Sequence, residues 1–244
     1  MDGVALASRF SLATNRLNFC GPADAEPKLY QAITTGADLP SARRSLERFE
    51  ALMPYLEAIG RHHGLDPFDS RVVEAYWLGN ELLDGFDRAE FEGILSTLVK
   101  RGLPKSVATR LSRHLPARPL PFHMFHVAYV GVGAVTGHVP TTLPNMESCR
   151  PSWGTVVSVE GARLRVRKPS LEATAGRLSL SPEAETEIPF DARVLPGVKP
   201  GESVALHWGW PALVLSSQQR SAVERYTQRS LDAVNEVLPG LGIL

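Results

Sequence analysis

The hydrophobic pattern of the chain changes near Pro140. Before this point apolar residues recur every three to four positions, as on one face of an α-helix, whereas after it they alternate in short runs broken by turn residues. A change of this kind favours a helical part followed by a sheet. We therefore predict an α+β protein, with an α-helical domain over residues 1–144 and a small OB-like β-barrel with a C-terminal helix over residues 145–244.

The first part of the chain contains several segments with helical spacing of apolar residues. The most regular one runs from Ser41 to Ile59 and predicts a long amphipathic helix, which Pro54 is expected to kink. Further helices are expected over residues 5–17, 69–83, 87–99 and 105–114, and again over residues 216–238.

The segment 121–138 is apolar on every side, which favours a buried helix. A helix here places His123 and His126 one turn apart on one face. Gly131 and Gly133 allow neighbouring backbone to approach closely. Because the connection from this segment to Cys149 is short, we expect the two histidines to lie near that thiol.

Short strands are predicted in the second part of the chain. Residues 155–167 alternate on both sides of a Glu160-Gly161 turn, as two strands of a hairpin do. Further strands are expected over residues 177–180 and 187–190, and a turn at Gly201 leads into a strand that ends near His207.

Composition excludes several classes of function. Lysine plus arginine and aspartate plus glutamate are equal at 26 each, so no basic field favours nucleic acid as the main partner. No apolar run is long enough to cross a membrane, and the first residues do not form a secretory signal. Cys20 and Cys149 are far apart in the chain, so we expect two reduced thiols in a cytoplasmic protein, with a structural role for Cys20.

Two separated motifs resemble one family. Cys149 is followed five residues later by Gly154, and the later segment reads Gly201-Glu-Ser-Val-Ala-Leu-His207-Trp-Gly-Trp210. With this order and context, residues 149–235 resemble the HypC/HupF-type chaperone of nickel–iron hydrogenase maturation. The chain departs from that family because Cys149 is internal and because Trp153 stands where the family has proline.

The resemblance implies both a fold and a cargo. It implies a small barrel with a C-terminal helix, and it implies that Cys149 and His207 bind iron carrying cyanide and carbonyl ligands, as an Fe(CN)2CO unit. A thiolate in a polar loop is a suitable soft ligand, and one cysteine with one histidine leaves the coordination set open, as a carrier requires. His123 and His126 are candidates for additional ligands.

These observations lead to a main hypothesis and two alternatives. The main hypothesis is a hydrogenase assembly factor that binds or transfers the iron unit, or docks to a hydrogenase precursor, with hydrogenase maturation proteins or the large subunit as partners. The first alternative is an enzyme that uses Cys149 and nearby histidines to make or modify an iron ligand. The second is an interaction module without metal. We favour a metal-fragment chaperone over an enzyme.

Overall fold

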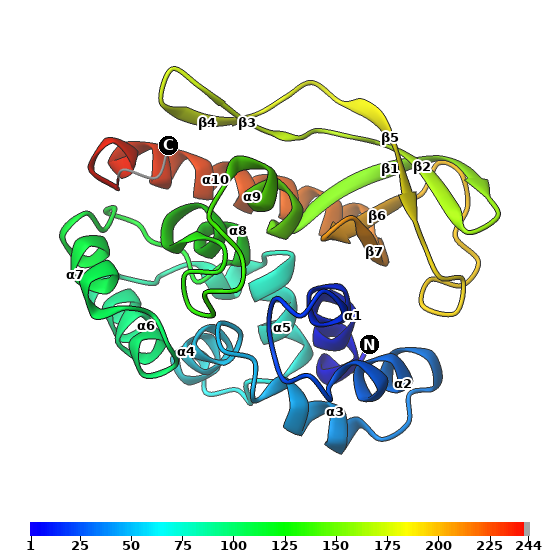
Figure 1. Cartoon of the computed structure of the whole chain (residues 1–244), viewed down its shortest axis with the longest axis horizontal. Coiled ribbons are helices and arrows are strands. Elements are labelled where there is room, and N and C mark those ends of the chain that lie inside the picture. Colours follow the sequence, from blue (N-terminus) through cyan, green and yellow to red (C-terminus); the bar gives the residue numbers. More distant parts are fainter. Residues whose placement is uncertain (242–244) are drawn as a thin grey trace.

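The protein has an α+β fold in which a helical part lies beside an antiparallel sheet (Figure 1). A computed structural model describes residues 1–241. The helical part contains α1 (Gly3–Arg16), α2 (Glu26–Thr35), α3 (Leu39–Leu46), α4 (Met53–His63), α5 (Ser70–Trp77), the 3₁₀ turn η1 (Glu81–Leu83), α6 (Arg88–Lys100) and α7 (Lys105–Arg113). The predicted helix over residues 87–99 is confirmed, and Asp87 begins it with a capping box that includes Glu90.

The prediction of one long helix from Ser41 to Ile59 is wrong. The chain leaves the helix after α3 and begins α4 at Met53, with Pro54 in the first turn, where a missing N–H is tolerated. The Arg101 guanidinium donates to the carbonyls of Glu47 (3.1 Å) and Phe49 (3.2 Å) in the connection. These bonds satisfy carbonyl groups that a continuous helix would have used.

The segment 121–138 is buried as predicted but is not a regular helix. It forms one turn, α8 (His123–Phe125), and then the π-helical turn η2 (His126–Gly131), all of whose residues are buried. Gly133 has φ +68°, and a Cβ atom there would lie 1.9 Å from the carbonyl oxygen of Val139. Only glycine permits this close return of the chain.

The sheet has five antiparallel strands in the order β5-β2-β1-β6-β7. Its strands are β1 (Ser152–Glu160), β2 (Arg163–Lys168), β5 (Ala184–Pro189), β6 (Ser203–His207) and β7 (Trp210–Leu215), and a separate hairpin is formed by β3 (Leu171–Thr174) and β4 (Arg177–Leu180). The predicted hairpin around Glu160-Gly161 is confirmed by β1 and β2. Closure into a barrel is not confirmed, because in the described chain β5 and β7 are the free edges of an open sheet.

The last helix connects the two parts. Helix α10 (Ser217–Leu241) packs against α8 and η2 on one side and against β4, β1 and β7 on the other, as Figure 1 shows. Its Asn235 side chain bonds both backbone groups of Leu178 in β4, at 2.8 and 2.9 Å. The main hydrophobic cluster therefore includes residues from both sides of the predicted boundary, and helix α9 (Leu143–Cys149) spans residue 144 itself.

Across residues 1–241, the helices are too short or too polar to cross a membrane.

Candidate metal centre

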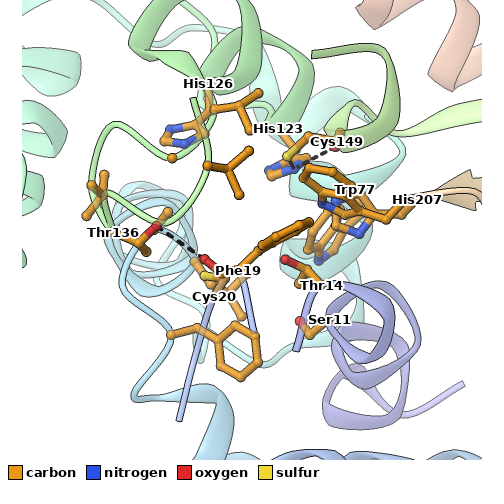
Figure 2. Close-up of a pocket in the computed structure, with 18 of the residues that line it drawn as sticks. Ser11, Thr14, Phe19, Cys20, Trp77, His123, His126, Thr136, Cys149 and His207 are labelled. Atoms are coloured by element: carbon orange, nitrogen blue, oxygen red, sulfur yellow. Dashed lines mark hydrogen bonds between the residues drawn. The ribbon is translucent and has the colours of Figure 1, made fainter. Parts of the chain in front are cut away.

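Three side chains that can bind a metal meet in the interior. They are His123 at the start of α8, Cys149 at the end of α9 and His207 at the end of β6. Their possible ligand atoms all lie within 4.8 Å of one another. Figure 2 shows the three residues together on one side of a cavity. The structure therefore brings together three of the four predicted ligands.

The turn between β6 and β7 brings His207 to Cys149. Trp208 and Gly209 both have positive φ, +52° and +72°, which is the pattern of a tight two-residue hairpin turn. The backbone N–H of Trp208 donates to the carbonyl of Ser148 at 2.6 Å. This bond joins the turn to the residue before Cys149, so the two motifs of the sequence meet.

A buried ion-pair network fixes the C-terminal end of α9, next to Cys149. Arg150, which is fully buried, bonds Glu147 at 2.7 Å and the carbonyl of Pro169 at 2.8 Å, and Lys168 also pairs with Glu147. Burial acts to raise the pKa of Glu147, but the charges of Arg150 and Lys168 outweigh it and lower that pKa. The residue next to Cys149 is thereby anchored to the start of the β3 hairpin.

His207 already has the tautomer that a metal requires. Its Nδ1–H donates to the carbonyl of Phe10 in α1 at 2.6 Å, so Nε2 carries the lone pair. That Nε2 is buried and has no hydrogen-bond partner among the described residues. Burial lowers the pKa of His207 to about 4 and outweighs the nearby carbonyls of Phe10 and Cys149, of which only that of Phe10 accepts a hydrogen bond from the ring. The ring is therefore neutral at physiological pH.

His123 contacts Cys149 directly. Its Nε2 lies 3.0 Å from the Cys149 carbonyl oxygen and 3.6 Å from Sγ, while Nδ1 lies 2.7 Å from the Tyr76 hydroxyl. Burial holds the pKa of His123 well below its usual range, so this ring is also neutral. To bind a metal through Nε2, His123 must carry its proton on Nδ1 and donate it to Tyr76.

The environment of Cys149 differs from the predicted polar loop. The residue ends helix α9 and is only partly exposed. Burial raises the pKa of its thiol to about 12, and the Trp208 indole opposes this shift only in part. A thiol of this kind is protonated at neutral pH unless a cation binds it, which corrects the expectation of an exposed thiolate.

The three ligands face a small cavity. The volume of the cavity is about 60 Å³, and most of its wall is apolar. His126 and Cys149 line the same cavity, as the short connection between them predicts. However, His126 lies outside the group of three ligands, and its Nδ1 is 2.8 Å from the Tyr55 hydroxyl.

Several residues of the site were missed by sequence reasoning. Cys20 was expected to have only a structural role, yet it lines the cavity, where its Sγ lies 3.5 Å from a Glu50 carboxylate oxygen. The adjacent Tyr76 and Trp77 supply a partner and a wall for His123, and Trp77 also packs against His207 with ring centroids 5.0 Å apart. The sequence feature that could have indicated Tyr76 and Trp77 is the presence of two adjacent aromatic residues on a predicted helix.

The fold and this cluster define an α+β protein with a buried group of two imidazoles and one thiol. The chain belongs to a family of unknown function (DUF6390), which residues 1–240 match. No curated protein and no solved structure matches the chain. The match covers both the helical part and the sheet.

Proposed function

We propose that this protein binds one transition-metal ion or metal fragment through His123, Cys149 and His207 and acts as an assembly factor that carries it. The observation that supports this most strongly is the convergence of three ligand atoms within 4.8 Å. One of them, His207 Nε2, is a buried acceptor without a partner among residues 1–241. A buried polar atom of this kind costs free energy unless something binds it.

The ligand set favours a soft or borderline metal with an open position. Thiolate and imidazole suit Fe, Zn and Cu rather than Mg or Ca. Three protein ligands leave at least one position free, which a closed structural site does not. Iron with strong-field diatomic ligands is a suitable cargo, because a thiolate is a soft donor and the cavity has room for only a few small groups.

The likeness to the hydrogenase chaperones makes the proposal more specific. Cys149 and His207, the two residues that carry that resemblance, are neighbours in the site. The open sheet and the segment between β5 and β6 also have a small apolar cluster of their own, separate from the main core: Val156, Leu164, Val166, Ile188, Phe190, Leu195, Val198, Val204 and Leu206. On this basis we propose an Fe(CN)2CO unit as cargo and hydrogenase maturation proteins or the large subunit as partners. Both cysteines are free, which suits the reducing cytoplasm.

One observation favours a second candidate, catalysis by Cys149 with His123. Their Sγ and Nε2 atoms lie 3.6 Å apart, as in a nucleophile and its base. However, burial raises the pKa of the thiol and lowers that of the imidazole, so the neutral pair is favoured over thiolate and imidazolium. This environment suits a ligand that loses its proton to a metal better than an activated nucleophile.

The proposal is tested by metal loading and infrared spectroscopy. We expect the purified protein to bind one Co²⁺ or Fe²⁺, and Cys149→Ser to lose this binding while remaining folded by circular dichroism. Protein isolated anaerobically from cells that make nickel–iron hydrogenase should show carbonyl and cyanide bands, and hydrogenase activity should be lost with Cys149→Ser and reduced with His207→Ala. Cys20→Ser is the matched control. Full hydrogenase activity with Cys149→Ser would contradict the carrier role, and unchanged metal binding would contradict the site.

A further inference from the structure

The cavity beside the metal ligands contains unused hydrogen-bond donors. Trp77 and Trp208 both line it, and the Nε1 atom of each is buried without a partner among the described residues. An indole N–H can only donate, so each of these groups requires an acceptor. Buried donors are almost always paired in folded proteins, and two orphans in the wall of one cavity indicate a ligand that accepts hydrogen bonds.

Trp208 occupies a position that disfavours its side chain. It has φ +52° in a turn where asparagine, aspartate or glycine is preferred, and its ring packs on Phe19 with centroids 4.6 Å apart. Its indole N–H lies near the Cys149 thiol and favours the thiolate, but the two groups do not form a hydrogen bond of normal geometry, so the donor remains without a partner among the described residues. A bulky residue held in the left-handed region next to a site is a sign of a functional requirement. Trp208 therefore lies in the wall of the cavity that the three proposed ligands also line.

The remaining wall also favours a small acceptor. Among the residues that line this cavity there is no carboxylate, ammonium or guanidinium group. Ser11 and Thr14 supply hydroxyl groups from α1, and Figure 2 shows the Thr14 hydroxyl facing the cavity. The wall thus offers donors without a fixed positive charge, which suits a neutral or singly negative ligand.

Size restricts the ligand further. The cavity offers about 60 Å³, whereas a protein cavity that holds benzene measures about 150 Å³. Two- or three-atom ligands fit beside a metal in this space, and an aromatic ring does not.

We propose that the metal centre takes small, linear ligands of the cyanide or azide class, which accept hydrogen bonds from the indole N–H groups of Trp77 and Trp208. This inference rests on the metal site proposed above. The coordinating atom of the ligand replaces a water molecule at the open position on the metal. The lone pairs of the ligand accept hydrogen bonds from the two indole N–H groups, which keep their protons. The apolar wall excludes larger ligands, and the cavity thereby selects which metal fragment the protein carries.

The test uses the full chain loaded with Co²⁺, whose visible absorption reports ligand exchange. Azide should change the Co²⁺ spectrum, and the change should saturate as the azide concentration rises. Imidazole is a better metal ligand but has an aromatic ring, so it should not bind over the same range of concentration. Trp208→Phe and Trp77→Phe keep a ring but remove the donor, so each should weaken azide binding about 5- to 10-fold at unchanged Co²⁺ stoichiometry. Trp210→Phe, which removes an indole outside this cavity, is the matched control.

Two results would overturn the inference. If imidazole binds as tightly as azide, or if both tryptophan variants bind azide as the wild type does, the cavity does not select its ligand in this way. Co²⁺ binding without any response to azide would also reject the inference while leaving the metal site intact. If the wild-type protein does not bind Co²⁺ at all, the metal site itself fails, so the two failures are distinguishable.

Discussion

His123 has two polar neighbours that set different requirements on its ring. The Cys149 carbonyl accepts from Nε2–H, whereas a metal at Nε2 requires the proton on Nδ1, where the Tyr76 hydroxyl accepts it. A hydrogen bond to the second ring nitrogen of a ligand histidine orients the ring toward the metal. We expect Tyr76→Phe to weaken Co²⁺ binding about 10- to 100-fold, as measured by competition with a chelator. Tyr55→Phe removes the equivalent bond to His126 and should leave the affinity near the wild-type value, because His126 lies outside the ligand group.

The protonation states of the same residues predict a pH dependence of metal binding. Between pH 6 and 8 the pKa values of His207, at about 4, and of His123, well below its usual range, keep both rings neutral. The pKa of Cys149, at about 12, keeps its thiol protonated in this window, so binding a metal must release one proton. The apparent affinity should therefore rise about tenfold per pH unit. Calorimetry in two buffers of different ionisation enthalpy counts the protons, and a flat profile would show that Cys149 does not bind as thiolate.

At the scale of elements, the position of α9 depends on a buried charge. Arg150→Ala leaves Glu147 with only Lys168 as a charged partner and opens space in the core, so we expect a loss of about 3 kcal/mol in the free energy of unfolding. Urea unfolding measures it. Arg163→Ala breaks an exposed pair with Glu187 and should cost less than about 1 kcal/mol. Equal effects of the two substitutions would mean that the buried network does not hold α9.

Elements could be predicted from the sequence where the residues that determine them are neighbours in the chain. The start of the helix at Asp87 and the turn at Glu160-Gly161 depend on local signals, and both were predicted correctly. The break between α3 and α4 was missed because the carbonyl groups in it accept hydrogen bonds from Arg101, which is more than 50 residues away in the sequence. The same holds for the site. The motifs indicated Cys149 and His207, but the bond from His207 to Phe10 spans 197 residues and depends on tertiary packing.

At the scale of the whole molecule, the proposed metal joins the helical part to the sheet. Its ligands come from α8, α9 and β6, and His207 is also bonded to α1, so unfolding either part destroys the site. A ligand that binds only the folded chain stabilises it by about 2.7 kcal/mol at a free concentration 100 times its Kd. We therefore expect Co²⁺ to raise the Tm in a concentration-dependent manner and as a single transition. Cys149→Ser should show no such shift, whereas Cys20→Ser should behave as the wild type, because Cys20 lies outside the ligand group. A shift in which only part of the structure becomes more stable would show that the helical part and the sheet unfold independently and that the metal does not join them.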